Sequence, residues 1–152
     1  MRILIAAVGR LRPGAIRDLF DIYEKRLPWP TTVREFEAAK GRNPNERIRR
    51  EGAALLKAVP AGAVLVALDE GGRSLGSRAF AGRIGAWRDS GRADIAFVLG
   101  GADGLDKDVT AGADLVLAFG SMTWPHLLAR AMLMEQLYRA SSILSGHPYH
   151  HA

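Results

Sequence analysis

Glycine and small polar residues gather at three points where an apolar run of the sequence ends. The runs end at Leu68, Leu99 and Phe119, and glycine follows closely after each of them. Glycine lets backbone amides and carbonyls approach a flat ligand, so the three segments could form a nucleotide-like pocket of main chain and apolar side chains. The same glycines would also suit tight turns. The residues alone leave both interpretations open.

Polar side chains that could act on a substrate stand near the end of the chain. Arg139 follows Glu135 by four residues, which fits an ion pair on a helix surface or a site that binds phosphate or orients a base. Tyr149 and His150 form a polar aromatic pair that could stack on a flipped base and hydrogen-bond its edge. On their own they fit a frayed terminus better. No residue stands out as a general base.

The histidines do not indicate a metal site. His147, His150 and His151 cluster in the tail, but no carboxylate stands nearby and the chain has no cysteine, so we expect no bound metal. The lack of cysteine also excludes disulfides and thiolate sites. His126 follows Pro125 where a helix is expected to begin, which favours a role in helix entry over contact with the cofactor or with a partner subunit.

Positive charge is concentrated in the first part of the chain. The net charge is +5, and residues 1–60 hold 13 Lys and Arg against 7 Asp and Glu, a net charge of +6, which leaves −1 for the rest. This asymmetry favours a basic face for a polyanion over a merely solvated surface. The candidates for phosphate contact surround one expected helix start and are Lys40, Arg42, Arg47, Arg49 and Arg50.

Two common nucleotide-binding motifs are absent. The first apolar run ends in Val8-Gly9-Arg10-Leu11-Arg12, which is not a G-x-G-x-x-G fingerprint, and no G-x-x-x-x-G-K-[ST] loop occurs. These absences argue against a Rossmann dehydrogenase, a P-loop NTPase and the usual Rossmann-type methyltransferase.

Alternating strands and helices must position these residues. Apolar or alternating runs predict strands at residues 2–8, 31–37, 63–68, 95–99 and 115–119. Helical spacing predicts helices at 14–27, 44–59, 77–90 and 126–144, and leaves 145–152 as a tail. Asn43 and Ser77 fit helix caps. The alternation predicts an α/β fold, with a mostly parallel sheet and helices on both faces, in one domain over 1–152. Ligands bind beyond the carboxyl ends of such strands, where the three glycine-bearing segments should meet.

No part of the sequence indicates a membrane segment. No apolar stretch approaches the ~20 residues that span a bilayer. The apolar start is short, and Arg10 and Arg12 follow it at once, so it fits a core strand better than a signal peptide. We therefore expect a cytoplasmic protein that has no membrane contact.

An ordered set of short motifs resembles one known family. The set begins with Ile5-Ala6-Ala7-Val8-Gly9 and continues with Gly100-Gly101-Ala102-Asp103-Gly104, Ser121-Met122-Thr123-Trp124-Pro125-His126, Glu135-Gln136-Leu137-Tyr138-Arg139-Ala140 and His147-Pro148-Tyr149-His150. Each motif alone is weak, but their order is specific and covers essentially the whole chain. The sequence resembles the RlmH family, which are ribosomal large-subunit pseudouridine methyltransferases of the SPOUT superfamily.

The resemblance implies a fold, a cofactor and a reaction. It implies a C-terminal trefoil knot whose loops bind S-adenosylmethionine. It also implies a homodimer in which the tail of one subunit helps to build the site of the other. The implied reaction is methyl transfer to ring nitrogen 3 of a pseudouridine in large-subunit (23S) rRNA. Because the chain has no room for a separate RNA-binding domain, we expect recognition to depend on the shape of the dimer and on an assembled ribosome.

The resemblance also assigns roles to residues. Cofactor contacts are carried over to Leu68, Gly100, Gly101, Phe119, Gly120, Ser121, Met122, Thr123 and Trp124. Arg139, Tyr149 and His150 are placed at the catalytic site. The family has arginine where this chain has His151, and a histidine could contact phosphate only when it is protonated.

Two other functions compete with methyl transfer. The first is a non-catalytic basic α/β protein that binds RNA or the ribosome, and the strand-end glycines together with Arg139, Tyr149 and His150 argue against it. The second is a small-molecule enzyme with another nucleotide ligand. The pI of about 10.1 and the lack of phosphate-binding motifs argue against that one.

Overall fold

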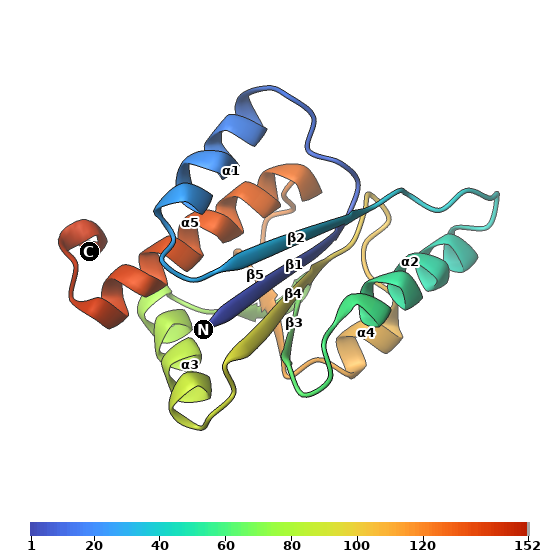
Figure 1. Cartoon of the computed structure of the whole chain (residues 1–152). Coiled ribbons are helices and arrows are strands. Elements are labelled where there is room, and N and C mark those ends of the chain that lie inside the picture. The colour runs from blue at the N-terminus through green and yellow to red at the C-terminus, as the bar shows by residue number, and fades with distance from the viewer. Residues whose placement is uncertain (152) are drawn as a thin grey trace.

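The computed structural model describes residues 1–151, in which strands and helices alternate along the chain (Figure 1). The strands are β1 (Arg2–Val8), β2 (Thr31–Phe36), β3 (Val64–Ser74), β4 (Asp94–Leu99) and β5 (Leu115–Ala118). The helices are α1 (Ala15–Arg26), α2 (Pro44–Ala58), α3 (Ser77–Asp89), α4 (Lys107–Ala111) and α5 (His126–Ser145). A 3₁₀ turn over Pro148–His150 follows. Ala152, the last residue of the predicted tail, lies outside the described residues.

The strands form one parallel sheet in the order β2-β1-β4-β3-β5. β1 lies between β2 and β4, and β5 lies at the edge beside β3. The predicted α/β fold with a parallel sheet is therefore confirmed. Because the strands run in the same direction, their carboxyl ends share one edge, and that edge is where an open parallel sheet binds ligands.

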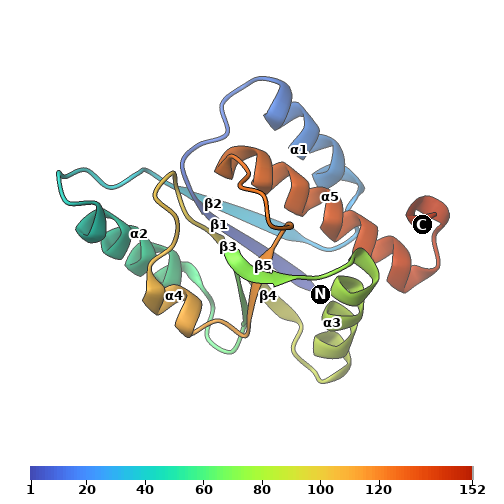
Figure 2. The ribbon, with the colours of Figure 1, turned by 180° about the vertical axis from the view of Figure 1, so that it is seen from behind.

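Helices cover both faces of the sheet (Figures 1 and 2). α1, α3 and α5 pack on one face, where Ile5 and Ala7 of β1 contribute to the core. α2 and α4 pack on the other, where Ala6 and Val8 are buried. Successive side chains of a strand point to opposite faces, so a strand covered on both sides must be apolar throughout. This explains the unbroken apolar runs of β1, β3 and β4.

β3 runs further than the sequence predicts. The apolar run predicts a strand over 63–68, whereas β3 continues to Ser74. Its pairing with β5 breaks after Leu68 and then resumes. Gly72 permits this continuation, because a Cβ there would lie 2.7 Å from the carbonyl carbon and oxygen of Val116. The second half of β3 therefore forms part of a strand where the sequence indicates a loop.

The short helix α4 and the cap of α3 differ from the sequence predictions. α4 is not predicted, because five residues are too few for helical spacing to show. Ser77 is predicted as a cap, but Gly76 occupies that position, and Ser77 Oγ instead donates to Gln136 Oε1 at 2.7 Å. Asn43 caps α2 as expected, since its side chain accepts a hydrogen bond from the backbone N–H of Asn45 at 2.9 Å.

The trefoil knot stays a prediction. The chain leaves β5 next to the extended half of β3 and then crosses to α5 (Figure 2). This arrangement is consistent with a knot in the C-terminal part of the chain. Among the described residues, no helix has the combination of length and apolar character that crossing a membrane requires.

Candidate active site

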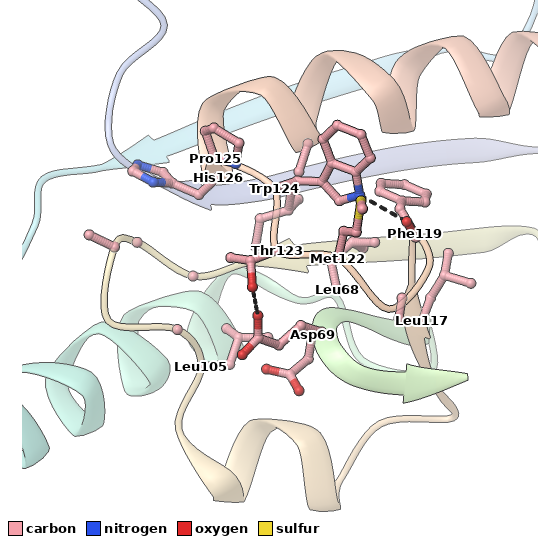
Figure 3. Close-up of a pocket in the computed structure, with 18 of the residues that line it drawn as sticks. Leu68, Asp69, Leu105, Leu117, Phe119, Met122, Thr123, Trp124, Pro125 and His126 are labelled. Atoms are coloured by element: carbon pink, nitrogen blue, oxygen red, sulfur yellow. Dashed lines mark hydrogen bonds between the residues drawn. The ribbon is translucent and has the colours of Figure 1, made fainter. Parts of the chain in front are cut away.

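A cavity of about 690 Å³ opens at the carboxyl edge of the sheet. Three segments line it: 68–70 from β3, 99–105 after β4, and a stretch from β5 into α5. Figure 3 shows their side chains turned toward a common space. Of the predicted cofactor residues, those in the lining are Leu68, Gly100, Gly101, Phe119, Gly120, Met122, Thr123 and Trp124. Ser121 stands in the same loop but is not part of the lining. The three segments therefore meet at one edge of the sheet, as the rule for parallel sheets predicts.

The wall that follows β4 consists of closely folded main chain. The N–H of Gly104 donates to the carbonyl of Gly101 at 3.0 Å. A Cβ at Gly100 would lie 2.4 Å from the carbonyl oxygen of Gly104, and one at Gly101 would lie 3.0 Å from Cγ1 of Val8. Close packing alone is therefore enough to require these glycines, which is what the tight-turn interpretation states. The same packing leaves backbone groups at the cavity surface, so the two interpretations are compatible.

The loop between β5 and α5 forms the opposite wall. Nε1 of Trp124 donates to the carbonyl of Phe119 at 2.9 Å, which closes the loop on itself. Oγ1 of Thr123 donates to Oε2 of Glu70 at 2.7 Å and links this loop to the extension of β3 (Figure 3). Met122 is 73% exposed and Trp124 is 42% exposed. The rim of the cavity therefore offers apolar surface.

The charged side chains of the lining are all acidic. Asp69, Glu70 and Asp103 are present, His126 is the other titratable group, and the lining contains no Lys or Arg. Asp103 pairs with Arg47, with 3.2 Å between Oδ2 and Nη2. Sequence reasoning did not single out these carboxylates, although Asp69 and Glu70 directly follow the apolar run of β3.

The lining suits a flat ligand that carries positive charge better than a nucleoside di- or triphosphate. Its volume lies within the range of cavities that hold small-molecule ligands. Main chain and apolar side chains suit a flat purine nucleoside. Three carboxylates without a lysine or arginine in the lining suit a ligand with positive charge and would repel phosphate groups.

An ion pair between a buried arginine and a partly exposed glutamate fixes the end of β1 beside this cavity. Arg130 of α5 has no exposed surface. Its Nη1 donates to Oε2 of Glu35 at 2.5 Å, and its Nη2 donates to the carbonyl of Gly9 at 2.8 Å. The same Glu35 oxygen accepts from the N–H of Leu11 at 2.7 Å. Sequence reasoning missed this pair, and the available signal was a single arginine inside the apolar run of α5.

His126 lies one helical turn before Arg130 and lines the cavity. Its Nε2 would lie 3.4 Å from a Cβ at Gly9, so the glycine makes room for the ring. Burial lowers the pKa of His126, the nearby charge of Arg130 lowers it further, and Glu51 opposes both. The ring is therefore predominantly neutral at neutral pH. The role in helix entry stays a prediction, and the ring also lies where it could contact a ligand in the cavity.

The predicted catalytic residues Arg139 and Tyr149 lie together, but away from the cavity. Nε of Arg139 donates to Oε1 of Glu135 at 3.0 Å, and the Tyr149 hydroxyl donates to the same oxygen at 2.9 Å. The Tyr149 hydroxyl also lies 3.2 Å from that of Tyr23. Burial and the hydrogen bonds to Tyr23 and Glu135 raise the pKa of Tyr149. Tyr149 therefore stays a neutral hydrogen-bond donor.

The separation of these groups follows from the length of α5. Arg139 stands 13 residues after His126, which is about 20 Å along the helix axis. Neither Arg139, Tyr149 nor His150 lines the cavity. A second groove, of about 440 Å³, lies on the other side of segment 117–120 and is lined by Glu135 among others. A single protomer therefore does not unite the two predicted halves of the site.

The predicted basic group lies on the loop before α2 and on its first turns. Arg42, Arg49 and Arg50 are exposed. Arg47 donates to the carbonyl of Gly41 at 2.6 Å as well as pairing with Asp103. The basic group therefore adjoins the cavity wall that follows β4. Among residues 1–151, no group of three or more His, Asp or Glu side chains could hold a metal ion.

Comparisons with known proteins agree on one family. Residues 1–150 match the family model described as a predicted SPOUT methyltransferase. A protein of Rhodospirillum centenum named Ribosomal RNA large subunit methyltransferase H is 61% identical over 152 residues, which is 100% of both chains. A Paramagnetospirillum magneticum protein of the same name is 53% identical over 99% of both chains.

A solved structure supports the fold. The crystal structure of a probable methyltransferase from Bordetella pertussis superposes with a TM-score of 0.59 at 14% identity. The superposition covers 91% of this chain and 95% of that one. At this level of identity the likeness concerns the fold alone. It agrees with the parallel sheet and flanking helices described above.

Proposed function

The chain belongs to the SPOUT methyltransferase family, and from this premise we propose that it transfers a methyl group from S-adenosylmethionine to large-subunit ribosomal RNA. The observation that carries the proposal is the 61% identity, over the whole of both chains, to a relative named Ribosomal RNA large subunit methyltransferase H. The proposed target atom is ring nitrogen 3 of a pseudouridine in 23S rRNA. The chain acts as a single domain over residues 1–152, in the cytoplasm.

The proposed cofactor site is the cavity at the carboxyl edge of the sheet. Backbone groups of Gly100 and Gly101 and the 119–124 loop would hold the adenine, and the apolar side chains of Leu68 and Trp124 would cover it. Bound there, S-adenosylmethionine supplies an electrophilic methyl group on a positively charged sulfur. The protein aligns the target nitrogen with that group and excludes water. The ring proton leaves to solvent.

We propose that a second copy of the chain completes the active site. Arg139, Tyr149 and His150 of one subunit would reach the cavity of the other in a homodimer. Two observations support this: these residues do not line their own cavity, and Leu19 and Ile22 are exposed apolar side chains of α1, the helix whose Tyr23 contacts Tyr149. Arg139 would bind phosphate or orient the base, while Tyr149 and His150 would stack on it and hydrogen-bond its edge.

The basic group is the proposed RNA face. Lys40, Arg42, Arg47, Arg49 and Arg50 adjoin the cavity, and phosphate contact by such residues makes binding depend on salt. We propose that the substrate is the large-subunit rRNA within an assembled ribosome. Reversing the charge of Arg49 and Arg50 should weaken ribosome binding and reduce its dependence on salt. Unchanged binding would move the RNA face elsewhere.

Methyl transfer to ribosomes tests the proposal directly. The protein is incubated with labelled S-adenosylmethionine and ribosomes that lack the modification, and mass spectrometry of the rRNA locates the label. We expect one methyl group on a pseudouridine of 23S rRNA. Ribosome binding without any transfer would favour the non-catalytic alternative. Transfer to another base would keep the enzyme class and overturn the proposed target.

A further inference from the structure

The acidic lining of the cavity contrasts with the charge of the whole protein. The chain carries +5, yet Asp69, Glu70 and Asp103 stand in the lining without any Lys or Arg. Arg47 partly neutralises Asp103. Within residues 1–151, no Lys or Arg side chain forms an ion pair with Asp69 or Glu70. The negative charge is therefore a local property of the cavity.

Both unpaired carboxylates are held in place by neutral donors. Oδ2 of Asp69 accepts from the N–H of Gly71 at 2.9 Å, which fixes the carboxylate on the extension of β3. Glu70 accepts from Thr123 Oγ1 across the cavity, between two of its walls. A charge that is fixed before a ligand arrives interacts with it without the cost of reorienting side chains. The negative charge therefore faces any ligand that enters.

We propose that Asp69 and Glu70 make the cavity bind S-adenosylmethionine more tightly than the product S-adenosylhomocysteine. The inference rests on the proposed function. In the transfer, the bond between sulfur and the methyl carbon breaks, and its electron pair stays on sulfur. The methyl carbon bonds to the ring nitrogen, which loses its proton to solvent. The sulfonium thereby becomes a neutral thioether, and the net charge of the bound molecule changes from +1 to 0.

The loss of charge weakens the attraction of the cavity for its ligand. A carboxylate several ångströms from a unit charge, in a partly open site, changes affinity by a few-fold, so two of them produce a ratio on the order of tenfold. Dissolved salt screens such an interaction. Methyl transfer thus converts the bound ligand to S-adenosylhomocysteine, for which the cavity has lower affinity. The lower affinity promotes release of this product.

Calorimetry with three ligands tests this inference without measuring activity. The ligands are S-adenosylmethionine, S-adenosylhomocysteine and sinefungin, in which a protonated amine replaces the methyl sulfonium. For the unaltered protein we expect S-adenosylhomocysteine to bind on the order of tenfold more weakly than the other two ligands. We expect this difference in affinity to shrink at high salt. This measurement needs no variant.

Isosteric variants then assign the effect to the two carboxylates. Asp69→Asn and Glu70→Gln each keep an oxygen that can accept the hydrogen bond seen in the structure. In the double variant we expect the ratio of the two dissociation constants to fall to about twofold, mainly because S-adenosylmethionine binds more weakly. Asp89→Asn, an exposed change at the end of α3, is the matched control and should leave the ratio unchanged.

Each other outcome has a defined meaning. Equal affinity for the charged and uncharged ligands, insensitive to salt, overturns the inference and leaves the proposed function intact. An unchanged ratio in the double variant overturns the roles of Asp69 and Glu70. A protein that binds none of the three ligands overturns both this inference and the proposed cofactor.

Discussion

The two ends of α5 hold different kinds of structure. At the start of the helix, Arg130 is fully buried and holds main-chain carbonyls at the end of β1, beside a cavity built largely from loops. Near the other end, Arg139 and Tyr149 share one oxygen of Glu135 at a partly exposed surface. The first arrangement has fixed partners, whereas the second consists of side chains that pair with each other and can exchange partners.

This difference separates two tasks of the proposed enzyme. The proposed cofactor end lies within one protomer and depends on close packing. At the substrate end, Arg139 and Tyr149 can bind a ligand only when their hydrogen bonds to Glu135 break. We expect changes at the first end to affect stability and cofactor binding, and changes at the second end to affect methyl transfer alone.

The largest effect is expected from removing the buried arginine. Arg130→Ala leaves a cavity in the core and the carbonyls of Val8 and Gly9 without their donor, which should lower the free energy of unfolding by about 3 kcal/mol. Urea denaturation measures this. Arg139→Ala, on the same helix, is the control and should cost less than about 1 kcal/mol. Equal losses in the two variants would contradict the contrast between the ends of α5.

The next largest effect concerns methyl transfer. Arg139→Ala combined with Tyr149→Phe should reduce transfer to ribosomes by about 100-fold, because the base loses the groups that orient it. The affinity for S-adenosylmethionine, measured by calorimetry, should stay unchanged. Loss of cofactor binding would show that the two ends are not separable. Full activity would remove both residues from the proposed site.

A smaller effect is expected at the cavity wall. Gly100→Ala introduces a Cβ 2.4 Å from the carbonyl oxygen of Gly104, so the loop must shift, at a cost of about 2 kcal/mol. Thermal unfolding should show lower stability, and calorimetry should show weaker cofactor binding. Gly82→Ala on α3 is the control, because nothing lies within 4 Å of its Cβ. Identical behaviour of the two variants would contradict the close packing of this wall.

The smallest effect is a dependence of stability on pH. Burial and Arg130 lower the pKa of His126 below its ordinary value of 6.5, so the unfolded chain binds a proton more readily than the folded one. This contribution to stability is present above pH 6.5 and is lost as the pH falls through the lowered pKa. Thermal unfolding between pH 8 and pH 5 should show a shallower decline for His126→Gln than for the unaltered protein. Parallel curves would contradict the prediction.

The sequence predicts the sheet well, because burial on both faces leaves strong apolar runs. It misses the second half of β3, where pairing depends on the fit of Gly72 against Val116, and it misses α4, which is too short for a periodic pattern. It places the three glycine-bearing segments at one edge by the rule for parallel strands. It does not reveal the pairing of Arg130 with Glu35, because 95 residues separate them.

The tail shows the limit of residue-by-residue inference. The family resemblance places Arg139 and Tyr149 in one site with the cavity residues, and that joint placement stays a prediction. Four residues of spacing predict the pairing of Arg139 with Glu135, which the structure contains. Nothing in the spacing predicts that Tyr149 contacts Tyr23 on α1, since that contact depends on where the chain turns after α5.

The position of β5 has a consequence for the order of folding. β1 to β4 and the helices between them lie within the first 99 residues, but the third wall of the cavity comes from β5 and the start of α5. A nascent chain that has completed β4 therefore has no ligand site to stabilise it. If the proposed cofactor binds only the final structure, it should slow unfolding without accelerating folding, a distinction that denaturant-jump kinetics can measure.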